Sequence, residues 1–126
     1  MITFPHGITD EEIGNARDAC KAQIGFYGST PAYWPVLETH GYGDLGRKLN
    51  AMTKSGEWDQ LAAQIPDDLL ELFCAIGRYD EIAKHIEERF GNMTDVISTG
   101  LNEDFPPDLI QDIQKIEGSF VGFNTD

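Results

Sequence analysis

The sequence lacks any apolar run close to the ~20 residues that a membrane-spanning helix requires. Residues 1–6 also lack the basic start and the apolar centre of a secretory signal peptide. These two absences predict a cytoplasmic protein that has no membrane partner.

Basic residues are scarce in this chain. It has 9 lysines and arginines against 22 aspartates and glutamates, which gives a formal net charge of -13. Such a charge repels phosphate backbones and anionic lipid headgroups from any surface that is not locally basic. We therefore expect no nucleic-acid partner, and a dedicated polyphosphate site is disfavoured.

Cysteine and histidine are also rare. Cys20 and Cys74 lie far apart without the spacing of a metal site, so we interpret them as small buried residues rather than as a disulfide. His6, His40 and His85 are not paired with another ligand type at metal-binding spacing. No metal site is predicted.

Common catalytic motifs are missing. The chain has no Gly-x-Ser-x-Gly elbow, no Walker loop and no Gly-x-Gly-x-x-Gly fingerprint, and residues 41–46 (GYGDLG) have only a loosely similar shape. Neighbouring carboxylates such as Asp67-Asp68 and Glu87-Glu88 are expected at helix starts or on outer faces, where the helix dipole and solvation account for them. No acid/base pair is marked, so the catalytic residues stay unknown.

The remaining features predict a single, mostly helical segment over residues 1–126 with one core. Thr9 and Glu12 have the form of a capping box, and apolar residues at helical spacing follow for about four turns. Helical signals recur at four later places: from Asp44 to about Ser55, over residues 58–65, from Asp67 after Pro66, and over 82–90 before Gly91. A last helix is predicted from Pro107.

Two short apolar runs favour strands, namely residues 74–77 and 94–99. A strand, a helix and a strand in this order are typical of a crossover between parallel neighbours. The fold class predicted is therefore mainly α with two short parallel strands. Two strands alone do not make a stable parallel sheet, so this unit is expected to be part of something larger.

An aromatic stretch over residues 26–38 (FYGSTPAYWPVLE) stands between the first two helical regions. Gly28 is suited to a hinge, Thr30 and Pro31 to a helix start, and Pro35 to a kink inside the short helix that Gly41 ends. Its aromatic side chains could wall a ligand pocket, with His40 as a further pocket candidate, or they could cap the core. Core packing is the favoured interpretation from the residues alone.

Residues 23–38 and the following HGYGDLG at 40–46 resemble the C-terminal region of luciferase-like monooxygenases, in the branch of flavin- or deazaflavin-dependent oxidoreductases. The resemblance extends over about residues 16–99. In that family residues 74–77 correspond to the seventh strand of an eight-stranded (β/α) TIM barrel and residues 94–99 to the eighth. The sequence departs from the family at Gly77-Arg78-Tyr79-Asp80, where relatives commonly have a small residue and a proline before the acidic helix start. It also departs at Trp34, where a basic residue is common.

The resemblance implies that this chain is the C-terminal third of such a barrel and is incomplete and inactive on its own. The complete parent would use FMN or a deazaflavin and a small-molecule substrate, whereas no cofactor is expected for the isolated chain. Tyr27, Ser29, Thr30 and Tyr33 match the stretch that lies near the substrate side of the pocket in such enzymes. The resemblance assigns no residue to cofactor binding.

Two alternatives of other classes stay open. The first is a free-standing helical interaction or assembly module that derives from this fold and has no catalytic activity. Exposed strand edges and unfilled apolar helix faces favour self-association, so we expect a homo-oligomer. The second is an acidic ligand-binding domain built around Tyr33 and Trp34.

Overall fold

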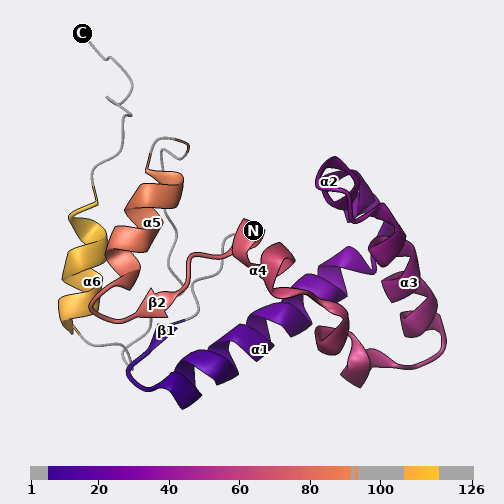
Figure 1. Ribbon diagram of the computed structural model, residues 1–126, viewed down its shortest axis with the longest axis horizontal. Helices are drawn as coiled ribbons and strands as arrows, with labels where there is room; N and C mark the ends of the chain where they lie inside the picture. The colour runs from indigo at the N-terminus through magenta and orange to yellow at the C-terminus, as the bar shows by residue number, and fades with distance from the viewer. Residues whose placement is uncertain (1–5, 92, 94–106, 117–126) are drawn as a thin grey trace, which may run out of the picture.

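The computed structural model describes residues 6–91, 93 and 107–116 of the chain. Within these residues the protein is mainly helical, as predicted, and two short strands lie between α1 and the pair α5 and α6 (Figure 1). The α-helices are α1 (Asp10–Gly28), α2 (Trp34–Thr39), α3 (Gly43–Lys54), α4 (Asp67–Phe73), α5 (Ile82–Phe90) and α6 (Pro107–Gln114). The 3-10 turns are η1 (Pro31–Tyr33), η2 (Trp58–Gln60) and η3 (Ala62–Gln64), and the strands are β1 (His6–Gly7) and β2 (Gly77–Arg78). No described helix combines the length and the hydropathy that a membrane span requires.

The predicted capping box starts α1. The Glu12 N–H donates to the Thr9 hydroxyl over 3.2 Å, and the Glu12 carboxylate accepts from the N–H groups of Thr9 (2.9 Å) and Ile8 (2.8 Å). These bonds satisfy N–H groups that have no partner inside the helix. The helix begins where the sequence places it.

The same hydrogen bonds make the stability of the fold depend on pH. The N–H groups of Thr9 and Ile8 lower the pKa of the Glu12 carboxyl below its ordinary value of 4.5. Because the folded pKa lies below the unfolded one, the carboxylate stabilises the fold above the unfolded pKa, and this is lost as the pH falls through the folded pKa. We expect Glu12→Gln to flatten the acid limb of stability, measured by urea unfolding between neutral pH and pH ~3. Glu11→Gln is the matched control, and an equal effect there would contradict the prediction.

The aromatic stretch folds differently from the prediction at two points. Gly28 does not adopt the positive φ of a hinge, because it is the last residue of α1 and Ser29 caps this helix. Pro35 does not kink a helix, because it lies in the first turn of α2, where its missing N–H costs nothing. Pro31 does begin η1, with Thr30 in the N-cap position. Gly41 ends α2 as predicted, with a φ of 81°.

The strand predictions are confirmed only in part. β2 begins at Gly77, the last residue of the predicted run, and pairs in parallel with β1 in the register His6 to Gly77 and Gly7 to Arg78. The prediction for residues 74–77 was therefore wrong in its bounds, and β1 was not predicted at all. The predicted strand at 94–99 lies outside the described residues. The structure shows one two-stranded sheet in its described part and does not confirm a portion of a barrel.

The predicted helix over 58–65 was also wrong. The segment forms the two 3-10 turns η2 and η3 instead of an α-helix. Its apolar residues are still buried as their spacing suggests, since Leu61 and Ile65 are 3% and 2% exposed. Burial of two side chains at this spacing is compatible with either helical form, which explains the error.

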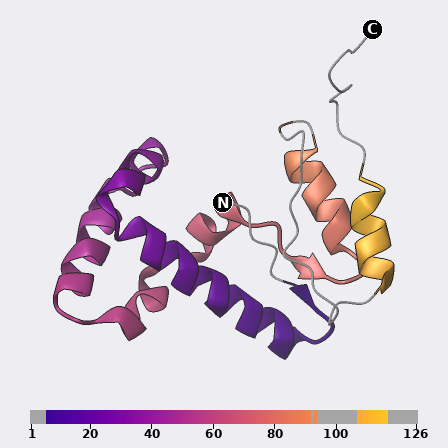
Figure 2. The ribbon, with the colours of Figure 1, turned by 180° about the vertical axis from the view of Figure 1, so that it is seen from behind.

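The buried side chains form two clusters rather than the single core that was expected. Side chains of the four helices α1, α2, α3 and α4 contribute to the first cluster, which includes Leu49 and Leu69. Side chains of α5 and α6 contribute to the second cluster, which is centred on Ile86. Both ribbon views show α5 and α6 side by side and away from α2 and α3 (Figures 1 and 2). Cys74 belongs to the first cluster and Ala75 to the second, so the chain passes between the two clusters at this point.

Candidate functional site

A cavity of about 240 Å³ lies at the C-terminal end of α1. Residues of α1, η1, α2 and α4 surround it: Ile24, Tyr27, Gly28, Tyr33, Val36, Leu37 and Phe73. Their side chains are apolar except for the two phenol hydroxyls. Two of the predicted site residues, Tyr27 and Tyr33, line this cavity.

Trp34 fixes the segment that forms one wall of the cavity. Its indole Nε1 donates to the Gly28 carbonyl over 3.1 Å, and the ring lies against Gly46 of α3. The Arg47 guanidinium covers the ring, with its Cζ 5.6 Å from the ring centroid. Trp34 also packs against the first cluster. Trp34 therefore serves packing, as the favoured interpretation of the stretch proposed.

Tyr27 and Tyr33 come together at the cavity. Their ring centroids are 5.2 Å apart, with an angle of 68° between the ring planes. Aromatic pairs prefer such edge-to-face arrangements, so the two rings stabilise each other at the cavity. The Tyr33 side chain is 45% exposed, so it lies at the entrance rather than inside the core. The lining thus offers mainly apolar contacts, together with the side chains of two tyrosines.

The structure places the other three candidate residues outside the cavity lining. The Ser29 hydroxyl is buried and donates to the Phe26 carbonyl over 2.6 Å, while Asn50 Nδ2 donates to the Ser29 carbonyl over 2.9 Å. Thr30 and His40 are exposed. Thr30 makes no side-chain capping bond, and His40 follows the last residue of α2. The described geometry therefore joins Tyr27 with Tyr33 alone among the five candidates.

Sequence reasoning missed Ile24 and Phe73 as cavity residues. Ile24 lies on the apolar stripe of α1, which the periodicity does show, but nothing in that stripe marks the end that faces a cavity. Phe73 ends α4 and reaches the cavity from a distant part of the sequence. Only the packing of α4 against α1 brings it there.

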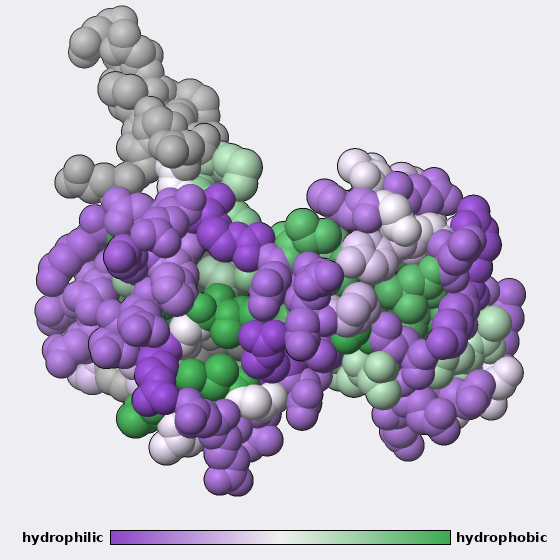
Figure 3. Space-filling model, in the orientation of Figure 1, coloured by the Kyte–Doolittle hydropathy of each residue, from purple (hydrophilic) through white to green (hydrophobic). Residues whose placement is uncertain are grey.

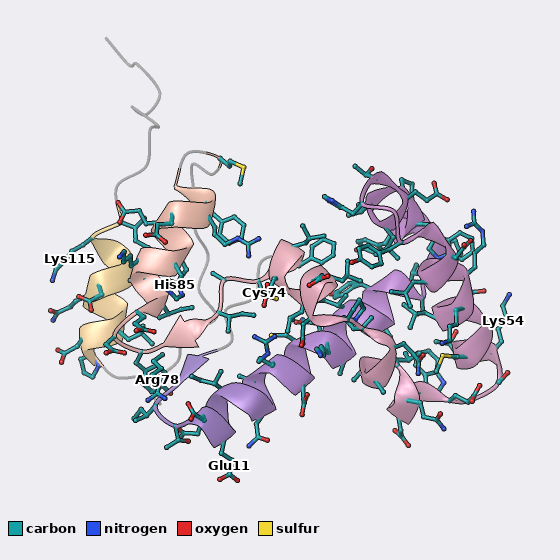
Figure 4. The ribbon with its side chains drawn as sticks, in the orientation of Figure 1. Glu11, Lys54, Cys74, Arg78, His85 and Lys115 are labelled. Atoms are coloured by element: carbon teal, nitrogen blue, oxygen red, sulfur yellow. The ribbon has the colours of Figure 1, made fainter. Side chains whose placement is uncertain are left out.

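A second, polar cleft of about 400 Å³ lies beside α5. Its lining combines two arginines, two glutamates and a histidine with two apolar residues: Arg17, Glu71, Cys74, Ile76, His85, Glu88 and Arg89. Figure 4 shows His85 on α5 and Cys74 on the segment that follows α4. Within the described residues, no group of histidine, cysteine and carboxylate side chains is arranged to hold a metal ion.

Asp67 forms an ion-pair network at the edge of this region. Its carboxylate lies 2.7 Å from Lys21 Nζ and 3.1 Å from an Arg17 guanidinium nitrogen. Hydrogen bonds from Lys21 and then Arg17 lower the pKa of the Asp67 carboxyl. The network connects α1 to the first residue of α4. Asp67 therefore has a structural role at the helix start that the sequence predicts there.

Comparison with known proteins gives relatives that are much longer than this chain. Uncharacterized proteins of Mycobacterium tuberculosis and Mycobacterium bovis are each 43% identical over 89 residues, which is 71% of this chain and 26% of those proteins. The 5,10-methylenetetrahydromethanopterin reductase of Archaeoglobus fulgidus is 26% identical over 94 residues, or 69% of this chain and 27% of the reductase. The chain thus spans about a quarter of the length of the curated relatives it matches. No family model matches it, and no solved structure matches it.

Proposed function

We propose that this chain is a C-terminal segment of a luciferase-like oxidoreductase or monooxygenase that depends on a flavin or a deazaflavin. The observation that carries the proposal is the similarity to a protein named as a reductase, over most of this chain and a quarter of that protein. In this proposal the segment contributes helices, the last barrel strands and part of the substrate-side pocket, and Tyr27 and Tyr33 belong to that pocket. Residues 1–126 act as one segment of the parent fold.

The cavity itself does not fit the cofactor. Its volume of about 240 Å³ lies below the ~300–1,000 Å³ that ligand pockets usually have. Its lining also has no cationic side chain to bind a cofactor phosphate. We therefore propose that FMN or the deazaflavin binds to another part of the parent protein. This part corresponds to the sequence of the relatives outside the matched stretch. The small-molecule substrate would reach the cavity only in the complete enzyme.

The isolated chain is expected to give no turnover with reduced FMN or a reduced deazaflavin. The reason is that in this proposal the segment supplies only part of the substrate-side pocket, while the group that carries the redox chemistry binds elsewhere in the parent. Oxidation of the cofactor is followed by its absorbance, with the full-length Archaeoglobus reductase as the positive control. Turnover by the isolated chain would overturn the proposal that it is a segment.

A second candidate function, self-assembly, is favoured by one specific observation. Four rings form a continuous row at the end of α1, which we call the aromatic row: Phe26, Tyr27, Tyr33 and Trp58. Phe26 and Trp58 are 52% and 51% exposed, and their ring centroids are 6.1 Å apart. No charged residue occurs between Lys21 and Glu38. Interface centres are typically enriched in aromatic residues and depleted of charge.

Because of this row, we expect the chain to form a homo-oligomer that becomes tighter as salt screens the repulsion between acidic copies. Phe26→Ser combined with Trp58→Ser should yield a monomer, since both rings are half exposed and their loss should leave the fold intact. Light scattering across a concentration series measures the mass. Met93→Ser is the matched control, because Met93 is 72% exposed and does not belong to the row. A monomeric native chain at high concentration would contradict this second candidate.

A further inference from the structure

The polar cleft beside α5 contains a guanidinium that no carboxylate of the described residues neutralises. Arg89 Nη1 donates to the Cys74 carbonyl over 2.9 Å, and Arg89 Nη2 donates to the Leu72 carbonyl over 3.2 Å. The Phe90 ring centroid lies 5.4 Å from Arg89 Cζ. These partners are all neutral, and the Arg89 side chain is half-buried. Such an arginine usually has an anionic partner, because burial removes part of the water that solvates its charge.

The other charged side chains of the cleft do not leave a charge over. They belong to two groups of ion pairs, each neutral as a whole: Arg17 and Lys21 with Asp67 and Glu71, and Lys84 with Glu88. The two glutamates that line the cleft are also 58% and 59% exposed, so water screens their charges. The positive charge of Arg89 therefore remains for a ligand, although the whole chain carries -13.

His85 offers a hydrogen-bond acceptor to the same cleft. Its Nδ1 lies 2.5 Å from the Ile76 carbonyl oxygen. Because a carbonyl oxygen only accepts, Nδ1 holds the proton and donates it in this bond. In the neutral imidazole the second nitrogen, Nε2, is then an acceptor. Nε2 has no hydrogen-bond partner among the residues that the structure describes.

Gly77 determines which edge of the imidazole faces the backbone. A Cβ atom on Gly77 would lie 2.8 Å from His85 Nδ1 and 3.1 Å from its Cε1. The Nδ1 edge therefore lies against β2, and the lone pair of Nε2 points away from the Ile76 carbonyl. His85 and Arg89 are four residues apart on α5, so they share one helix face with ~5–6 Å between their Cβ atoms. One small ligand can reach both side chains.

A ligand that matches these two side chains has a carboxylate and a neighbouring hydroxyl. A guanidinium has five N–H donors, and two of those of Arg89 bind the carbonyls, so three have no partner among the described residues. A carboxylate forms short, charge-assisted hydrogen bonds to such donors. The hydroxyl would donate to His85 Nε2. A phosphate dianion matches less well, because the chain is acidic and two glutamates line the cleft.

We propose that the polar cleft binds a small hydroxy acid, with Arg89 paired to its carboxylate and His85 Nε2 accepting from its hydroxyl. The cleft volume of about 400 Å³ lies within the ~300–1,000 Å³ that ligand pockets usually have. On the face shown in Figure 3, the residues over α5 and α6 are mostly hydrophilic, which is suited to a polar ligand. The proposal does not depend on the proposed redox function, because this binding needs no cofactor.

Sodium lactate is the probe, because it has a carboxylate and a hydroxyl on adjacent carbon atoms. The native chain is titrated at constant ionic strength and followed by NMR of the His85 and Arg89 side chains. We expect saturable shifts of both, with a Kd in the millimolar range. Propionate lacks the hydroxyl and should bind about tenfold more weakly, which is the effect of one hydrogen bond. Lactamide lacks the charge and should also bind at least about tenfold more weakly than lactate.

Arg89→Lys tests the guanidinium, because lysine keeps the charge but donates from a single nitrogen. We expect this variant to bind lactate about tenfold more weakly than the native chain. Arg47→Lys is the matched control, since it makes the same exchange on α3, where Arg47 pairs with Glu38 and does not line the cleft. Its Kd for lactate should stay within about twofold of the native value. Helical circular dichroism shows whether both variants fold.

Several results would overturn the proposal. One is the absence of saturable shifts at both side chains with lactate. Another is equal affinity for lactate and propionate, or for lactate and lactamide, because the hydroxyl or the charge would then not be recognised. Inorganic phosphate that binds more tightly than lactate, or an equal loss in Arg47→Lys and Arg89→Lys, would also contradict it. If Arg89→Lys does not fold, the comparison of the probes on the native chain decides.

Discussion

Replacing Leu49 with alanine is expected to lower the free energy of unfolding by about 2–5 kcal/mol, the largest effect that we expect for a single side chain. Leu49 lies in the middle of α3, is 0% exposed and belongs to the first cluster. Its Cδ1 approaches the backbone of α1 at Gly28, where an added Cβ would lie only 3.0 Å away. Loss of the side chain therefore opens a void between α3 and α1 that neighbouring atoms fill poorly.

Urea unfolding followed by circular dichroism measures this loss, with Leu72→Ala as the control. Leu72 is 41% exposed, so its truncation removes little buried area and should cost less than about 1 kcal/mol. Equal losses for the two variants would show that α3 does not pack on α1 as described. Because Gly28 and Leu37 border the cavity and Leu49 lies against this region, the variant should also widen the cavity.

The helix boundaries could be predicted where the signal is local. Thr9 with Glu12, Pro66 before Asp67, and Gly91 after Phe90 each act on hydrogen bonds within one or two turns, and the structure places helix ends at all of them. Gly28 shows the limit of this reasoning. This glycine is the last residue of α1, as a glycine often is, but it also allows Leu49 of α3 to pack closely on α1, which no local signal in the sequence indicates.

The strands could not be predicted from local signals alone. Burial of Cys74 and Ala75 follows from their apolar run, and both are almost inaccessible, at 0% and 1% exposure. The partner is β1, about 70 residues away, because His6 pairs with Gly77. The register between β1 and β2 leaves no periodic pattern in the sequence. The same is true of the hydrogen bonds from His85 and Arg89 of α5 to the carbonyls of Ile76 and Cys74. The predicted partner at 94–99 lies outside the described residues.

The candidate site could also be predicted only in part. Tyr27 and Tyr33 lie in one aromatic stretch, so a single local feature marked both, and they meet at the cavity. Ser29 belongs to the same stretch, but its hydroxyl has a backbone carbonyl as partner because α1 ends there. Two residues that are close in the sequence need not point in the same direction, because neighbouring side chains at the end of a helix lie on different faces. Phe73 required the tertiary packing of α4.

Gly46→Ala is expected to destabilise the fold by about 1–3 kcal/mol, although alanine is the better helix former. The added Cβ would lie 2.6 Å from Trp34 Cδ1 and 3.1 Å from Leu37 Cδ1. Both atoms belong to side chains that pack in the first cluster, so the indole must shift and its hydrogen bond to Gly28 must lengthen. The cavity wall beside it moves with Trp34.

Gly14→Ala supplies a control with the opposite sign. Gly14 lies inside α1, and nothing is within 4 Å of the position of its Cβ. Alanine there should stabilise the chain by about 0.5–1 kcal/mol, because it reduces the backbone freedom of the unfolded state without a clash. Urea unfolding gives both energies, and near-UV circular dichroism reports the packing of the indole. If Gly46→Ala stabilised the chain as Gly14→Ala does, Trp34 would not pack against α3, and the cavity would lack the support that fixes its aromatic wall.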